Sequence, residues 1–244
     1  MRPLFLLLLA GLTGAPAAQA SLATDLPVTA PALARAVVQV TPEQRLAALR
    51  AAAPDANPEV LGHALQALQC ASANGMTDSS RLAVIDYSLP SSTPRLWVFD
   101  LDNQRLLFRE LVAHGRNTGE RMATRFSNEL DSRTSSIGLF RTGETYQGSN
   151  GYSLRMQGLE PGFNDRAEER AIVMHGAPYV TEDHVRRFGR IGRSWGCPAV
   201  RLGVARQIID TLKGGQFVFS WYPDSQWLHA SRYLNCNSQR TARR

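Results

Sequence analysis

The stretch Gly192-Arg193-Ser194-Trp195-Gly196-Cys197-Pro198-Ala199 places a single cysteine between a glycine and a proline. Upstream, the apolar run 171–174 predicts a short buried strand that ends at His175. A thiol reacts as the thiolate, and a neighbouring imidazole is the usual means of forming one at neutral pH. Cys197 and His175 are therefore the predicted nucleophile and general base of a cysteine enzyme. The alternative is a buried structural cysteine, which is common for free thiols.

The residues around Cys197 suit an acyl-transfer site. Gly196 tolerates backbone angles and close approaches that a side chain would forbid. Pro198 has no N–H, so backbone donors for an oxyanion are expected from Cys197 itself or from the residues before it, especially Gly196. Ser194 and Trp195 are expected to shape the rim, with the tryptophan along one wall of a peptide groove.

A second histidine, His114 in His114-Gly115, ends the apolar run 106–113 in the same way. We rank His175 first as the base because it lies closer in sequence to Cys197. A metal site is not expected, because the sequence has no His-Glu-x-x-His motif and no paired cysteines at the spacing of zinc ligands.

Apolar runs separated by glycine-rich loops follow Gly75 along the chain. Six of them are predicted strands: 82–87, 95–101, 106–114, 136–141, 171–175 and 216–222. The segments 143–151 and 158–164 are predicted loops. Many strands, one clear late helix at 204–212 and no alternation of strand and helix predict a mainly β fold, either a β-sandwich or a barrel-like sheet.

Two helix-start signals precede the strands. Thr41-Pro42-Glu43 and Asn57-Pro58-Glu59 each combine a capping side chain, a proline at the first helical position and an acid in the first turn. They predict a helical hairpin over 41–75 that packs on the catalytic domain, 76–236. Thr181-Glu182-Asp183 predicts a further, shorter helix.

The N-terminus carries the pattern of a secretory signal, which ends at Ala18-Gln19-Ala20, so residues 1–20 are a predicted signal peptide. A membrane anchor is the alternative, but the apolar run is short for ~30 Å of hydrocarbon. Residues 21–40 are a predicted linker and 237–244 a basic tail. We expect an exported protein of the periplasm or cell-wall space, with no stable membrane insertion after cleavage.

The formal net charge of +6 comes almost wholly from arginine, since Lys213 is the only lysine. Nucleic acid is not an expected partner, because no run of basic residues with interleaved aromatics occurs. The dense arginine cluster at 186–193 surrounds the predicted site instead. There it could orient a substrate that carries a carboxylate.

Three cysteines in an exported chain suggest one disulfide and one free thiol, with three pairings open. We favour Cys70–Cys236, because pairing Cys197 would silence the nucleophile. Such a bridge would close a long loop and stabilise the fold by up to about 4–5 kcal/mol in the chain-entropy model. The alternative is that all three cysteines are reduced.

Several short motifs occur in a specific order before the stretch at 192–199. They are Val112-Ala113-His114-Gly115, Phe126-Ser127-Asn128, Ser135-Ser136-Ile137-Gly138, Gly143-Glu144-Thr145-Tyr146, Asn150-Gly151-Tyr152-Ser153 and Ile172-Val173-Met174-His175-Gly176. Together they resemble the murein L,D-transpeptidase catalytic domain family of the YkuD-like superfamily, from about Leu82 to Trp221. The resemblance implies a β-sandwich-like L,D-transpeptidase fold that uses no metal and no organic cofactor.

The resemblance also implies roles. Cys197 would attack an L,D-amide of a peptidoglycan stem peptide, hold the acyl group as a thioester and pass it to an amine of another stem or of a wall-anchored protein. His175 is similar to the acid/base histidine of the family, and Gly176 to the residue whose carbonyl orients it. Ser194 and Gly196 match the Ser/Thr-x-Gly-Cys frame.

Two positions depart from the wider superfamily, which usually has histidine before the glycine and Asn or Arg two positions after the cysteine. Here these are Trp195 and Ala199. Arg193 or Arg201 could compensate in substrate binding. The expected substrate contacts are His114, Arg193, Trp195 and Tyr152.

Other functions remain open at this point. An L,D-carboxypeptidase or endopeptidase would give the same acyl group to water, and a noncatalytic wall-binding module would keep only the fold. A papain-like protease is disfavoured, because there the nucleophile opens a long helix, which Pro198-Ala199-Val200 does not predict.

Overall fold

The computed structural model describes residues 40–77 and 79–236. The predicted signal peptide, nearly all of the predicted linker and the predicted basic tail lie outside these residues. No helix within the described ranges is both long and apolar enough to cross a membrane.

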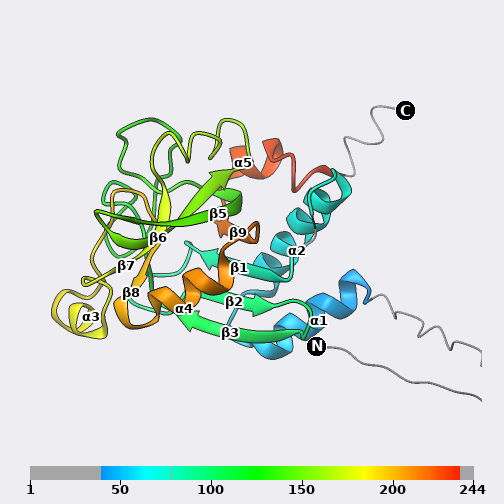
Figure 1. Cartoon of the computed structure of the whole chain (residues 1–244), viewed down its shortest axis with the longest axis horizontal. Helices are drawn as coiled ribbons and strands as arrows, with labels where there is room; N and C mark the ends of the chain where they lie inside the picture. The colour runs from blue at the N-terminus through cyan, green and yellow to red at the C-terminus, as the bar shows by residue number, and fades with distance from the viewer. Residues whose placement is uncertain (1–39, 78, 237–244) are drawn as a thin grey trace, which may run out of the picture. The chain divides into compact units, whose positions relative to one another are not determined.

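The strands of the described chain form one mixed nine-stranded sheet in the order β3-β2-β1-β9-β5-β6-β7-β8-β4. Figure 1 shows β3, β2 and β1 side by side. Most neighbours are antiparallel, while β1 with β9 and β7 with β8 run parallel. The strands are β1 (Arg81–Asp86), β2 (Leu96–Asp100), β3 (Arg105–Glu110), β4 (Val112–Ala113), β5 (Gly138–Gly148), β6 (Gly151–Gly158), β7 (Val173–Ala177), β8 (Ala199–Arg201) and β9 (Phe217–Trp221).

The two edges of this sheet are consecutive in the chain. Strands β3 and β4 lie at opposite ends of the order but are separated in sequence only by Leu111. A chain this short cannot span a flat sheet of nine strands, which lie ~4.8 Å apart, so the sheet must curl until its edges approach. The prediction of a mainly β, barrel-like fold is confirmed.

Two helices cover one face of the sheet. They are α1 (Pro42–Ala52) and α2 (Pro58–Ala73), and they begin at the predicted caps: the Thr41 hydroxyl accepts from the N–H of Gln44, and the Asn57 carbonyl oxygen of the side chain accepts from Glu59. The apolar face of α2 packs against β1, β5 and β9. The expected N-terminal helices are confirmed.

The other face is covered by α4 (Leu202–Leu212). Its buried residues recur at the spacing of one helical face, namely Ala205, Ile208, Ile209 and Leu212. Strand β1 shows how the two cores are separated. Leu82 and Val84 join the α2 core, whereas Ala83 and Ile85 join the α4 core, because successive side chains of a strand point to opposite faces.

Two further helices are short: α3 (Glu182–Phe188), capped by Thr181 as predicted, and α5 (Ser225–Ala230). The sequence did not predict α5. It is anchored by Trp227, whose indole N–H donates to the buried Glu160 carboxylate at 2.8 Å.

The prediction of a loop at 143–151 is wrong in part. Strand β5 continues through Gly143 to Gly148 and pairs with β6, which the sequence did not predict as a strand. The pairing shifts register between Thr142 and Thr145, so a bulge takes up the extra residues. Glycine, read as a loop signal, here marks an irregular ladder and a tight turn between two long strands.

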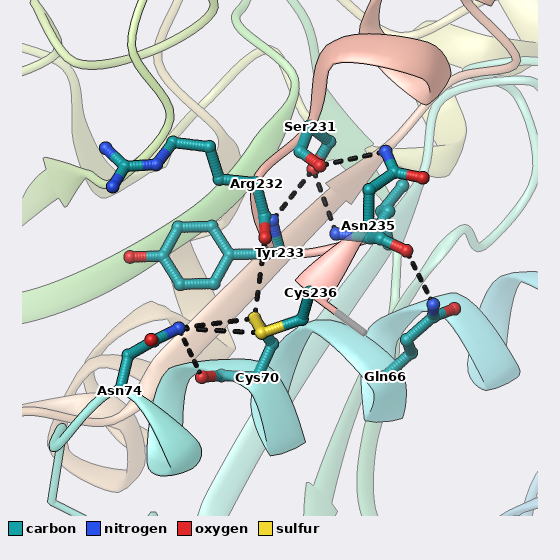
Figure 2. The surroundings of a disulfide bond; sticks show 9 residues. Gln66, Cys70, Asn74, Ser231, Arg232, Tyr233, Asn235 and Cys236 are labelled. Carbon is teal, nitrogen blue, oxygen red and sulfur yellow. Dashed lines mark hydrogen bonds between the residues drawn. A yellow bond between two sulfur atoms is a disulfide. The ribbon is translucent and has the colours of Figure 1, made fainter. Parts of the chain in front are cut away.

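A disulfide joins α2 to the end of the described chain (Figure 2). Cys70 and Cys236 are 166 residues apart in sequence, and their Cα atoms lie 5.8 Å apart. The Asn74 amide lies over both sulfur atoms, and the Gln66 amide donates to the Leu234 carbonyl at 2.6 Å. The predicted pairing is confirmed, and Cys197 is the free cysteine among the described residues.

Candidate active site

The parallel pairing of β7 and β8 places the segments that carry the two predicted catalytic residues side by side. His175 lies opposite Ala199 in the ladder, and its N–H donates to the Pro198 carbonyl at 3.4 Å. The Val173 N–H donates to the Cys197 sulfur at 3.5 Å. The sulfur is therefore bonded to β7 at Val173, which precedes His175 by two positions in the sequence.

A tight turn ahead of Cys197 sets the position of the thiol. The Ser194 hydroxyl accepts from the Gly196 N–H at 3.1 Å and donates to the Cys197 carbonyl at 2.7 Å. Gly196 has φ +126, and a Cβ there would lie 2.6 Å from the Thr134 carbonyl oxygen. Only glycine fits this position, for its conformation and for its space.

Ser135 holds the turn from the opposite side. Its hydroxyl donates to the Gly196 carbonyl at 3.0 Å and accepts from the Gly115 N–H at 3.1 Å. Gly115 also forms an isolated parallel bridge with Ser194. The segments at 115, 135 and 194–197 are thus joined by hydrogen bonds beneath the nucleophile.

His175 has the environment of a base. Its Nδ1 lies 3.0 Å from the Gly176 carbonyl, which fixes the Nδ1–H tautomer and leaves Nε2 to accept a proton. Burial lowers the pKa of His175, opposed by its bond to Gly176, so the ring is neutral near pH 7. A Cβ on Gly176 would lie 2.8 Å from the Ala205 Cβ, so α4 packs directly against this residue.

Cys197 is 8% exposed, and burial raises the pKa of its thiol. The Val173 N–H and the positive charge of Arg170 act in the opposite direction. A thiol in this setting is protonated at neutral pH and requires a base to become a nucleophile.

Arg170, which was not predicted from the sequence, binds the loop that packs against Gly196. Its guanidinium donates to the carbonyls of Ser127 and Thr134 and to the Ser132 hydroxyl, at 2.7, 2.6 and 3.1 Å, and it also bonds the Ser136 hydroxyl. It therefore fixes the Thr134 carbonyl against which Gly196 packs. No local pattern singles out this arginine, because its partners come from a loop about 35 residues earlier.

Three of the expected substrate contacts have side chains that are bonded to other parts of the protein. His114 is fully buried between Arg95 and the carbonyls of Gly119 and Glu120. Arg193 donates to the Arg116 and Gly119 carbonyls and pairs with Glu120 at 2.6 Å. The Tyr152 hydroxyl donates to Asp210 of α4 at 2.7 Å.

Trp195 differs from these three because it is 68% exposed beside the nucleophile. The Arg133 guanidinium lies over its ring, 4.6 Å from the ring centroid. Within the described ranges, no group of three or more His, Cys, Asp or Glu side chains could hold a metal ion.

The L,D-transpeptidase catalytic domain model matches residues 52–221, which include every candidate catalytic residue described above. The chain belongs to this family. No curated protein matches the chain. The family acts on peptidoglycan stem peptides and works in the cell wall, and its members are usually enzymes.

Solved L,D-transpeptidases are similar to the chain at low identity. That of Mycobacterium smegmatis is 14% identical with a TM-score of 0.39, over 60% of each chain. That of Mycobacterium tuberculosis H37Rv is 14% identical with a TM-score of 0.36, over 60% of this chain and 59% of the other. That of Stackebrandtia nassauensis is 12% identical with a TM-score of 0.36, over 72% and 76%. The chain thus spans about 60% of the first two L,D-transpeptidases.

Proposed function

We propose that the protein is an exported, cysteine-dependent peptidoglycan L,D-transpeptidase. One observation carries this proposal: the Cys197 thiol bonds to β7 at Val173, two residues from a buried, neutral His175 whose Nε2 is left to accept a proton. The family supports the substrate class, stem peptides of peptidoglycan.

In the first half-reaction, Nε2 of His175 takes the thiol proton, and the thiolate attacks the carbonyl carbon of an L,D-amide. The oxyanion that forms needs backbone donors. The Gly196 N–H is already bonded to Ser194, so we assign this role to the Cys197 N–H. His175 then gives its proton to the leaving amine, the C–N bond breaks, and the acyl group remains on sulfur as a thioester.

The second half-reaction reverses these steps. An amine of another stem peptide, or of a wall-anchored protein, attacks the thioester while His175 takes its proton. The C–S bond breaks, and the thiolate recovers the proton. If water takes the place of the amine, the same site is an L,D-carboxypeptidase or endopeptidase.

The location of the protein is part of the proposal. The substrate lies outside the cytoplasm, and the Cys70–Cys236 disulfide is typical of an oxidising compartment. We therefore place the protein in the periplasm or the cell-wall space.

The test is to incubate the full exported chain with defined stem peptides and an amine acceptor, and to follow products and intact protein by mass spectrometry. We expect a mass increase on Cys197 equal to the acyl group, followed by a crosslinked or amino-acid-exchanged product. Shortened peptide alone would identify a hydrolase. Identical products from the Cys197→Ala variant, with its fold checked by thermal unfolding, would overturn the mechanism.

A further inference from the structure

One exposed pair beside the nucleophile is not used by the chemistry above. Trp195 is 68% exposed, and the Arg133 guanidinium stacks on its ring at 4.6 Å. Trp195 precedes Cys197 by two residues, so their Cα atoms are at most about 7.5 Å apart. A group that touches this pair therefore lies within the reach of a short peptide whose amide is bound at the thiol.

We propose that Arg133 and Trp195 form a subsite that binds a carboxylate of the acyl-donor peptide next to the scissile amide. This inference rests on the proposed function and adds the part of the substrate that is recognised. The carboxylate belongs either to the C-terminus of the leaving residue or to the side chain of the acyl residue.

The backbone of Arg133 is fixed in an uncommon conformation. Its φ is +54, in the left-handed region that few residues other than glycine adopt. The Asn117 N–H donates to its carbonyl at 3.1 Å, and a Cβ on Gly115 would lie 2.4 Å from the same oxygen. A strained position that is held from neighbouring segments is typical of functional sites. The backbone from which the guanidinium extends is thus fixed before a ligand binds.

Three other arginines near the nucleophile, Arg201, Arg193 and Arg170, are already occupied. Arg201 forms a two-point bond with the buried Glu110 at 2.6 and 2.7 Å. Arg193 is paired with Glu120, and Arg170 bonds two carbonyls and two hydroxyls beneath the loop. In the part of the chain that the structure describes, the Arg133 guanidinium has its stacking contact and no ion pair. Neither residue suggested by the sequence as a substitute for the missing Asn or Arg is therefore as available as Arg133.

The chemistry of the pair fits a carboxylate attached to an aliphatic group. A guanidinium presents parallel N–H donors that match two carboxylate oxygens, and it can do so while stacked on an aromatic ring. The exposed edge and face of Trp195 offer apolar contact to the carbon atoms next to the carboxylate. Cation–π contact also holds the long arginine side chain in one place.

The test uses one donor peptide in three forms: the free acid, the C-terminal amide and the side-chain amide. For each, kcat/KM is measured as the rate of acyl-enzyme formation on Cys197 by intact mass. We expect wild type to prefer the free acid by at least about tenfold over one of the two amides, and that amide identifies the carboxylate. Arg133→Gln should lose this preference, Arg133→Lys should recover part of it, and Trp195→Ala should weaken it.

The matched control is Arg155→Gln, since Arg155 stacks over Tyr146 at 4.5 Å in the same manner on the β5–β6 hairpin. It should keep both the rate and the preference. If wild type reacts equally with all three peptides, or Arg133→Gln keeps the preference, the subsite does not exist.

A binding measurement separates this inference from the proposed function. The Cys197→Ala protein and its Arg133→Gln double variant are titrated with the free acid and the amides by calorimetry. Tighter binding of the free acid that depends on Arg133, without acylation of wild type, would support the subsite and overturn the proposed function. Acylation at equal rates with all three peptides would support the proposed function and overturn the subsite. If the peptides neither bind nor acylate the protein, both the subsite and the proposed function are wrong.

Discussion

The chain contains the dipeptide His-Gly twice, and the two copies have different surroundings. His114-Gly115 follows β4, and His175-Gly176 lies within β7. Both histidines are buried, at 0% and 4% exposure. The sequence distinguished them by their spacing to Cys197 and by the resemblance of His175 to the acid/base histidine of the family.

The difference lies in the ring nitrogens. Nδ1 of His114 lies 2.8 Å from the Arg95 guanidinium, and its Nε2 lies 3.1 Å from the Glu120 carbonyl, so both nitrogens are bonded. Burial, followed by the charge of Arg95, lowers the pKa of His114 to about 3. Among the residues that the structure describes, His175 has a partner at Nδ1 and none at Nε2. A histidine that can exchange a proton is therefore recognised by its unbonded nitrogen rather than by the motif around it.

Replacing each histidine in turn tests which of the two acts as the base. His175→Gln should lower the rate of acyl-enzyme formation by about 10²–10⁴-fold, because glutamine cannot take the thiol proton. The rate is measured by intact mass with the donor peptide.

His114→Gln is the matched variant in this experiment. Its rate per folded molecule should stay within about threefold of wild type, since His114 has no nitrogen available to the substrate. A larger loss from His114→Gln than from His175→Gln would reverse the assignment of the base.

His114 should instead matter for the stability of the fold. His114→Ala removes a partner of the fully buried Arg95, and leaving a buried charge underbonded costs about 2–3 kcal/mol of unfolding free energy. Urea unfolding measures it, with the exposed His229→Ala as the control. Equal stability of the two variants would contradict the structural role of His114.

The same residue predicts a pH dependence of stability. The pKa of His114 is about 3 in the folded protein and has an ordinary value of 6.5. Between these values the unfolded chain binds a proton that the folded chain does not. The contribution of His114 is thus complete above about pH 6.5 and is lost as the pH falls towards 3, by up to about 1.4 kcal/mol per pH unit. When urea unfolding is measured at pH 7 and at pH 5, the free energy of unfolding should change less between the two pH values for His114→Ala than for wild type.

The smallest expected effect comes from Gly176. A Cβ there would meet Ala205 at 2.8 Å and Leu202 at 3.0 Å, so Gly176→Ala should shift the carbonyl that orients His175 and lower acylation by about tenfold. Gly203→Ala in α4 is the control, because a Cβ there meets nothing within 4 Å. Equal rates for the two variants would show that the carbonyl does not need its present position.

The apolar strands and the capped helices were predictable because their signals are local. Alternating or continuous apolar runs and the Thr41 and Asn57 caps each act within a few residues. Strand β6 was not predictable, since its glycines are typical of loops and its pairing depends on β5 and β7.

The residues of the candidate site also fall into those with a local sequence signal and those without one. Cys197 and His175 were predicted from short motifs, whereas Ser194 was expected on the rim and its bonds within the turn were not predicted. Ser135 and Arg170 act through segments about 60 and 35 residues away in sequence, and only the fold brings those segments together. Arg133 carries no sequence signal, because its stacking on Trp195 depends on a left-handed backbone that arginine seldom adopts.

The disulfide has a consequence for the order in which the molecule matures. Synthesis runs from the N-terminus, so Cys70 and Cys197 exist as free thiols before Cys236 does, and their premature pairing would block the nucleophile. The last strand, β9, ends at Trp221, so the sheet that buries Cys197 is complete in sequence before Cys236 is made. Folding before oxidation therefore buries Cys197 and brings Cys70 and Cys236 together, with their Cα atoms 5.8 Å apart, so the reactive thiol stays reduced.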